Sequence, residues 1–275
     1  MLGKLIKYDL KSCARIITSV YVFIVLCALS ARIMLIIYDV SDGTFKSISR
    51  ILFATLSFIL ILSIITACVI TLVMVVLRYR NNLLRDEGYL MHTLPVSPVK
   101  LYYSKIVTAM LLFITDIVVI IFSIILSGLP KSSGIGWAEV KSAMTTFNYG
   151  ALKYGLNGNF YIGCVIILLL VALYSSIAQL FASLNIGYSL PFGRGASKDL
   201  MSIIAYIATY IITQIIIVVL FIITTLLADF NFADEAAVMR YTSVLLCFII
   251  VIMAVFGTIY NIVSIKLMQK KLNLE

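Results

Sequence analysis

The sequence has little of the charge that keeps a soluble protein in water. Only 12 % of its 275 residues are Asp, Glu, Lys or Arg, whereas 63 % are hydrophobic, and the mean hydropathy is +1.13. Soluble domains carry about 25 % charged residues. The composition therefore excludes a soluble globular protein and predicts an integral membrane protein. Its net charge of +9 is then expected from the Lys and Arg residues that orient membrane spans, not from nucleic-acid binding.

Residues for metal or nucleophilic chemistry are also scarce. The chain has one histidine, His92. A single histidine argues against a histidine-based metal centre or a Ser–His relay within this chain. The five cysteines include no CxxC pair, so we expect buried thiols that act as small hydrophobic side chains. The chain has no GxxxxGK[ST] phosphate-binding loop, and Gly193–Lys198, the nearest segment, has the wrong spacing. We expect neither a cofactor nor enzymatic activity in this chain by itself.

Long apolar runs are the dominant feature of the sequence. A helix needs about 20 apolar residues to cross the hydrocarbon core of a bilayer. Six segments reach that length: Ile16–Tyr38, Ile51–Leu77, Ile106–Leu126, Phe160–Leu184, Ile203–Leu227 and Thr242–Ile265. The first run is too long, and its polar leader too extended, for a cleavable signal peptide. We predict an all-α integral membrane protein whose residues 1–275 form a single six-span transmembrane domain.

The distribution of Lys and Arg predicts how the spans are oriented. The two tails and the second and fourth loops carry fourteen of these residues, and the other three loops carry six. Positively charged loops stay in the cytoplasm. The sequence therefore predicts a multi-pass protein with both termini cytoplasmic.

Residues 1–15 have an amphipathic pattern. On a helix, four basic residues share one face, and Leu2, Leu5, Ile6, Leu10 and Cys13 share the opposite face. This pattern predicts an interfacial helix in the cytoplasmic headgroup layer. A solvated tail is the alternative, which Asp9 favours because it falls among the apolar residues.

The second loop, residues 78–105, reads RYRNNLLRDEGYLMHTLPVSPVKLYYSK. Asn81 or Asn82 is suited to cap a short helix that Gly88 ends. Ser97 and Pro98 are a capping residue and a first-turn proline, so a helix is expected to run from there into the third span. Several apolar residues lie outside the predicted spans, so other parts of a protein must shield them from water: Leu83, Leu84, Tyr89, Leu90 and Met91. We predict a structured cytoplasmic hairpin.

The run DEGYLMHTLPVSP at residues 86–98 resembles the cytoplasmic loop of bacterial ABC transporter permeases of the ABC-2 type. The basic opening MLGKLIKYDLK, the six spans and the closing KKLNL are similar too. The resemblance implies the membrane subunit of an ABC exporter in the bacterial plasma membrane. It also implies a second permease subunit, identical or homologous, and two ATPase subunits that bind ATP and Mg.

The resemblance further implies a coupling helix in residues 78–105 that docks on the ATPase. The residues expected to carry ATPase coupling are Arg85, Asp86, Glu87, Tyr89, Leu90 and Pro95. Pro95, with Pro98, would form a rigid elbow before the third span. Packing of the loop on its own protein alone is the alternative.

One departure from the family pattern concerns the outer loops. Many members have a long outer segment between spans 5 and 6, whereas here the long extracellular loop is 127–159, between spans 3 and 4. Trp137, Val140, Met144 and Phe147 share one helical face in that loop. The pattern predicts an interfacial helix at the outer leaflet, or a lid over an outward cavity.

Four polar residues within the spans are candidates for a transport pathway: Asp116, Arg32, Gln179 and Gln214. Asp116 lies about 15 Å into its span, near the midplane, where an ionisable group is costly. Arg32 is expected either to pair with Asp116 or to snorkel to the outer headgroups. A structural hydrogen bond is the alternative for Asp116. The two glutamines are more consistent with contacts between helices.

The function that the resemblance implies is export of an amphiphilic substrate, such as an antimicrobial peptide, a lipid or a drug, across the lipid bilayer. Alternating access would be coupled to a separate ATPase. An ATP-independent transporter or a toxin-immunity membrane protein is the alternative, with Asp116 as a proton relay. A membrane-embedded enzyme would need clustered His, Asp or Glu, which the spans lack.

Overall fold

The computed structural model describes residues 2–84, 97–128, 137–153, 158–190, 196–227 and 235–270, and the regular elements within these ranges are all helical. The long helices are α1 (Leu2–Val40), α2 (Thr44–Tyr79), α4 (Pro98–Ser127), α7 (Gly158–Ser189), α8 (Ala196–Leu227) and α9 (Glu235–Lys270). All six are long and apolar enough to cross a membrane. Within these ranges, the predicted all-α architecture with six helices long and apolar enough to span a membrane is confirmed.

The helices around the second loop extend beyond the apolar runs. α2 continues past Leu77 to Tyr79, and a π-helical turn at Arg80–Leu84 prolongs it. The expected cap at Asn81 or Asn82 is therefore wrong, because both residues lie inside this turn. α4 begins at Pro98 as predicted, and the Ser97 carbonyl accepts hydrogen bonds from the backbone N–H groups of Lys100 and Leu101 at 3.0 and 3.2 Å.

The N-terminal segment is the first part of α1, which runs unbroken from Leu2 to Val40. The helix therefore continues from residues 1–15 into the first apolar run, and the place of residues 1–15 in the headgroup layer stays a prediction. The two faces of the segment do differ in burial. Asp9 and Cys13 are buried, whereas the basic side chains are exposed: Lys4, Lys7, Lys11 and Arg15.

The chain forms two compact units. Unit 1 comprises residues 1–77 and 107–142, and unit 2 comprises residues 78–106 and 143–275. Most of α2 and the larger part of α4 belong to unit 1. The ends of these two helices that flank the second loop belong to unit 2.

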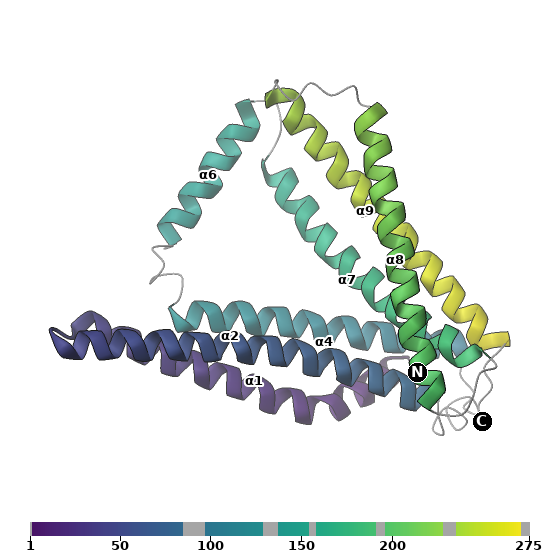
Figure 1. The fold of residues 1–275 in the computed structure, drawn as a ribbon, viewed down its shortest axis with the longest axis horizontal. Coiled ribbons are helices and arrows are strands. Elements are labelled where there is room, and N and C mark those ends of the chain that lie inside the picture. The colour runs from purple at the N-terminus through teal and green to yellow at the C-terminus, as the bar shows by residue number, and fades with distance from the viewer. Residues whose placement is uncertain are drawn as a thin grey trace. The chain divides into compact units, whose positions relative to one another are not determined.

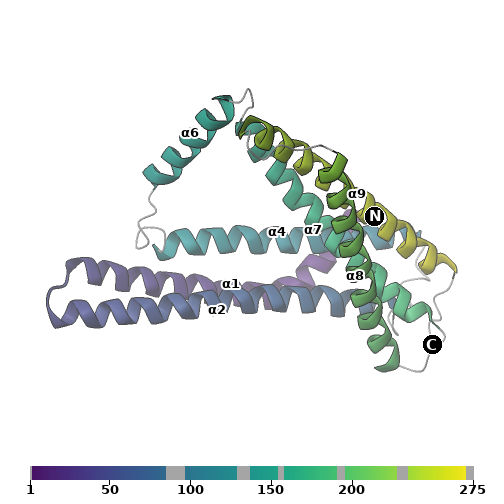
Figure 2. The ribbon, with the colours of Figure 1, turned by 45° about the horizontal axis from the view of Figure 1, so that its top comes forward.

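Unit 1 is built on a hairpin of α1 and α2 (Figure 2). Gly43, with a φ of +65°, lies in the turn that joins the two helices. Cys27 and Ala28 of α1 pack with Leu60 of α2, and Leu126 of α4 covers this cluster. Small side chains at such contacts allow helix backbones to approach closely, which stabilises bundles in lipid.

Unit 2 is centred on α7, which packs against both α8 and α9 (Figure 1). Two glycines lie where these helices approach each other closely. A β-carbon at Gly187 of α7 would lie 2.5 Å from the backbone of Ser202 in α8, and one at Gly257 of α9 would lie 2.9 Å from the ring of Tyr174 in α7. Glycine at these positions therefore sets how closely the helices pack.

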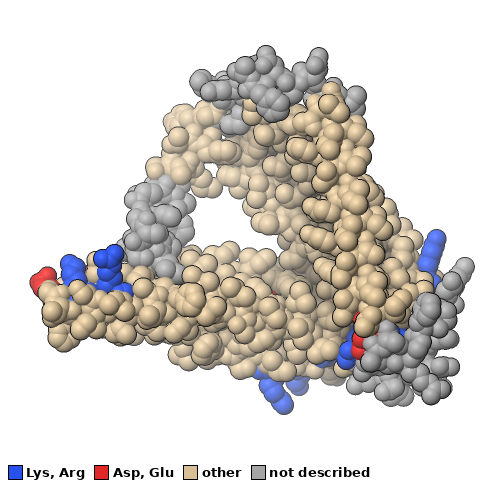
Figure 3. Space-filling view, in the orientation of Figure 1, with Lys and Arg blue, Asp and Glu red and all other residues tan. Residues whose placement is uncertain are grey.

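The surface of the described helices is strongly apolar. Large side chains of α8 are exposed along much of its length, among them Ile203, Ile207, Ile211 and Ile215. Figure 3 shows few Lys, Arg, Asp or Glu side chains on the described part of the face in view. Such a surface suits contact with lipid rather than water, as expected for a multi-pass membrane protein.

The loop after α4 contains a helix, α6 (Trp137–Lys153), where the periodicity predicted one. The ring of Phe147 packs edge-on against Tyr161 of α7, with centroids 5.8 Å apart, and Met144 is exposed. The position of α6 at the outer leaflet, as an interfacial helix or a lid, stays a prediction.

Candidate functional site

The described residues on either side of the second loop form the main candidate site. The predicted coupling residues themselves lie outside the described residues: Arg85, Asp86, Glu87, Tyr89, Leu90 and Pro95. Leu83 and Leu84, which the sequence predicted to need a cover, are buried in unit 2. The site therefore consists of the two flanks of the loop and the residues of α7, α8 and α9 that hold them.

Three buried aromatic rings join the flanks to α7. Tyr79 at the end of α2 stacks on Phe181 of α7, with ring centroids 4.0 Å apart. Tyr102 in the first turns of α4 lies edge-on to both rings, at 6.4 Å from Tyr79 and 6.3 Å from Phe181. All three side chains are almost completely buried. Offset-stacked and edge-to-face pairs add about 0.5–1.5 kcal/mol each beyond the burial of their area.

The hydroxyl groups of both tyrosines reach asparagines on neighbouring helices. The Tyr79 hydroxyl donates to Oδ1 of Asn185 in α7 at 3.0 Å, and Nδ2 of Asn185 donates back at 2.8 Å. The Tyr102 hydroxyl donates to Oδ1 of Asn261 in α9 at 2.7 Å. Asn261 also donates to the hydroxyl of Tyr174 in α7. Both asparagines are buried, so losing a partner would leave an unpaired polar group at a cost of about 1–3 kcal/mol.

An ion pair attaches the π-helical turn to α8. The Arg80 guanidinium lies 3.0 Å from the Asp199 carboxylate in the first turn of α8, and both side chains are about three-quarters buried. The Tyr188 hydroxyl near the end of α7 donates to the other oxygen of Asp199 at 2.6 Å. One carboxylate therefore connects the loop flank with two helices.

These contacts together constitute what we term the flank cluster: Tyr79, Arg80, Tyr102, Phe181, Asn185, Asp199 and Asn261. Both ends of the second loop are held by it. Buried aromatic stacking and paired hydrogen bonds resist independent movement of the flanks, because any shift breaks several contacts at once. The arrangement is suited to transmit a displacement of the loop to α7, α8 and α9.

A second polar centre lies in unit 1 around Asp116, whose side chain is only 3 % exposed. The Tyr21 hydroxyl of α1 donates to Oδ1 of Asp116 in α4 at 2.5 Å and lies 3.1 Å from Oγ1 of Thr115. Oδ2 of Asp116 is buried and accepts no hydrogen bond from the described residues. The alternative expected from the sequence, a structural hydrogen bond between helices, is therefore present at this residue.

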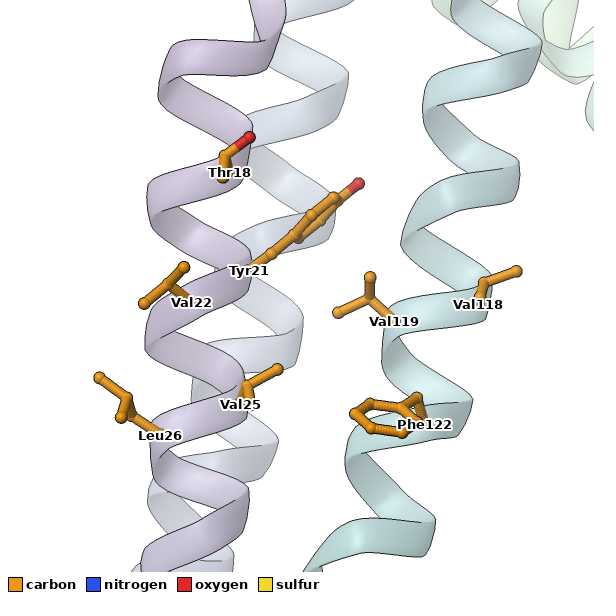
Figure 4. A pocket seen from close by; sticks show the side chains of 8 residues that line it. All are labelled: Thr18, Tyr21, Val22, Val25, Leu26, Val118, Val119 and Phe122. Carbon is orange, nitrogen blue, oxygen red and sulfur yellow. The ribbon is translucent and has the colours of Figure 1, made fainter.

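Beside this centre, α1 and α4 form the two walls of an open groove with a volume of about 440 Å³ (Figure 4). Tyr21 and Val25 line it from α1, and Val119 and Phe122 line it from α4. Its walls are almost wholly apolar. Asp116 does not line the groove, but the ring of Tyr21 does, so this tyrosine joins the groove to the buried carboxyl group.

The other pathway candidates lie elsewhere in the fold. Arg32 packs against Gly128 at the end of α4, where a β-carbon would come within 2.5 Å of its Nη1. Among the described residues it forms no ion pair with Asp116. Gln179 of α7 donates to Oγ1 of Thr209 in α8 at 3.4 Å, whereas Gln214 of α8 is exposed. Within unit 1, Arg32 and Asp116 therefore form no common site, and of the two glutamines in unit 2 only Gln179 has a side-chain contact with a neighbouring helix among the described residues.

Sequence reasoning missed most of the flank cluster. The signal that was available is the presence of two asparagines, Asn185 and Asn261, in or directly after apolar runs. Polar side chains there need partners on other helices. Which tyrosines serve as those partners is not visible in the sequence.

Within the described ranges, no three His, Cys, Asp or Glu side chains are grouped as metal ligands would be. Comparisons of the chain with protein-family models, with curated proteins and with solved structures give no match.

Proposed function

We propose that this chain is the transmembrane permease subunit of an ATP-driven ABC exporter. In this proposal it pairs with a second permease subunit, identical or homologous, and with two ATPase subunits. An amphiphilic substrate is moved across the bacterial plasma membrane by alternating access. Both termini lie in the cytoplasm, as the Lys and Arg distribution predicts, and the basic face of residues 1–15 lies at the headgroup layer.

The observation that carries the proposal is the flank cluster on either side of residues 85–96. A loop that resembles the ATPase-docking loop of ABC-2 permeases is attached at both ends to three other helices, through Tyr79, Arg80 and Tyr102. Attachment at both ends would let the loop pass a movement imposed by a partner to these helices, because a shift of either end disturbs several contacts at once.

In this mechanism the partner ATPase subunits bind ATP and Mg and supply the chemical energy. The residues of this chain receive and transmit the resulting movement. Docked coupling residues would shift with the ATPase, and the π-helical turn and the start of α4 would shift with them. Phe181, Asp199 and Asn261 would then carry the displacement into α7, α8 and α9.

The chemistry of the spans favours an amphiphilic substrate. The groove between α1 and α4 is lined by apolar side chains, with the Tyr21 ring beside Asp116 at one side. Sugars and ions need many convergent polar groups for binding. The apolar walls of this groove instead match a peptide, lipid or drug with a large apolar part.

The experiment that tests the proposal separates docking from transmission. Tyr89→Ala should release the ATPase, because removing an aromatic anchor from an interface costs about 2 kcal/mol or more, and Glu87→Ala should act more mildly. Tyr102→Phe removes only the hydroxyl bonded to Asn261. It should keep the ATPase bound but lower substrate-stimulated ATP turnover.

Tyr103→Phe is the matched control, because the neighbouring Tyr103 is 38 % exposed. It should leave both co-purification of the ATPase and turnover unchanged. If Tyr89→Ala retains wild-type binding and turnover, residues 85–96 are not the docking site and the proposal loses its main support.

An ATP-independent transporter is a second candidate, favoured by one observation, the buried Asp116 with an unpartnered oxygen. Transport assays in vesicles distinguish the two. Transport that continues without ATP but stops when the proton gradient is collapsed would favour the second candidate.

A further inference from the structure

The Asp116 centre combines deep burial with incomplete pairing. Asp116 lies within α4 in unit 1 and is 3 % exposed. One carboxyl oxygen accepts a hydrogen bond from Tyr21, and the other, Oδ2, has no partner among the described residues. Most buried polar side-chain atoms in proteins have a partner. An unpartnered oxygen at this depth therefore needs an explanation.

Among the described residues, no cation balances the carboxyl group of Asp116. The titratable groups that face it are Tyr21 from α1 and Cys68 from α2, and the hydroxyl of Thr71 also lies toward it from α2. Arg80 pairs with Asp199 in unit 2, and Arg32 packs at Gly128. The carboxyl group is therefore surrounded by neutral hydroxyl, thiol and apolar groups.

The ionised and the neutral form of Asp116 differ greatly in free energy in such surroundings. An isolated ionised carboxylate in an apolar medium is strongly disfavoured, and it neutralises where it can. A neutral carboxyl group with one unpaired O–H loses only about 1–3 kcal/mol. The neutral form also keeps Oδ1 as the acceptor for Tyr21. The form that carries a proton on Oδ2 therefore fits the packing of α1, α2 and α4.

We propose that Asp116 is a proton-binding site, and that its Oδ2 carries the proton when α1 packs against α4 through Tyr21. The proton binds to and leaves the carboxyl group, and no other bond is made or broken. Loss of the proton leaves a buried negative charge, which water or a cation must then stabilise. Proton occupancy is therefore linked to the packing of α1 against α4. The inference does not rest on the proposed function.

Infrared spectroscopy of the full chain in lipid vesicles tests this directly. A protonated carboxyl group has a carbonyl stretch that a carboxylate lacks. The wild-type protein should show this band at neutral pH and lose it at alkaline pH. Asp116→Asn should remove the band, whereas Asp39→Asn, which changes an exposed carboxyl on the same bundle, should retain it.

Tyr21→Phe provides a second and milder variant. It keeps the ring but removes the hydrogen bond to Oδ1, so the band should move to higher frequency. Identical spectra for folded wild-type and Asp116→Asn protein would overturn the inference, because Asp116 would then be ionised. If Asp116→Asn does not fold, Tyr21→Phe decides, and a band that does not move overturns the inference.

Discussion

The ring of Tyr79, at the end of α2, stacks on the ring of Phe181 in α7 with centroids 4.0 Å apart and planes inclined by 13°. The two residues lie far apart in the sequence, and both are buried. Because Tyr79 is the last residue of α2 before the π-helical turn, this stack fixes the start of the second loop to α7.

Replacing Phe181 with Ala should strongly destabilise unit 2. The substitution removes the stacking partner of Tyr79 and leaves a cavity, which costs about 3–5 kcal/mol for a buried Phe. Thermal unfolding of the purified protein in detergent measures the effect. Phe221→Ala in α8 is the control, because Phe221 is 46 % exposed. An equal loss of stability in both variants would contradict the assignment of Phe181 to the core.

Gly187→Ala should disturb the packing of α7 against α8. A β-carbon there would meet the backbone of Ser202 at 2.5 Å, so one helix must move. The matched control is Gly163→Ala in the same helix, where a β-carbon meets nothing within 4 Å. The control should be neutral or slightly stabilising, because Ala is the better helix former. For the Gly187→Ala variant, the midpoint temperature of thermal unfolding should be well below that of Gly163→Ala.

Arg80 and Asp199 should be energetically coupled. A double-mutant cycle with Arg80→Ala and Asp199→Asn should give a coupling energy of about 1 kcal/mol, because the pair is only partly shielded from solvent. Thermal unfolding of the single and double variants supplies the values. Arg80→Ala combined with Asp42→Asn, an exposed residue next to Gly43, should be additive. A coupling energy of zero for Arg80 and Asp199 would show that the ion pair does not contribute to the stability of the protein.

The charge distribution predicts which side of the membrane two positions face. In a variant without the five natural cysteines, a cysteine at Ser142 should react with an impermeant thiol reagent in intact cells. A cysteine at Asn81 should react only after the membrane is opened. Labelling of both positions in intact cells would reject the arrangement with six spans and cytoplasmic termini.

Local features of the fold were predictable because they depend on residues that are close in the sequence. Apolar runs of span length determine the six helices, since an exposed backbone in lipid must form its own hydrogen bonds. Ser97 and Pro98 determine where α4 begins, as the bonds to the Ser97 carbonyl confirm. The end of α2 was harder to predict, because buried contacts of Leu83 and Leu84 in unit 2 extend the helical turn past the apolar run.

The composition and the spacing of apolar residues determined by themselves the six helices that are able to span a membrane in the described part of the chain. Only the tertiary structure decided which polar side chains meet. Asp116 accepts its hydrogen bond from Tyr21, 95 positions away, and Asn261 accepts one from Tyr102, 159 positions away. Apolar periodicity identifies a helix but leaves its rotation and its neighbours open. These depend on the close approach at residues such as Ala28 and Gly187, where small side chains let particular helices come together.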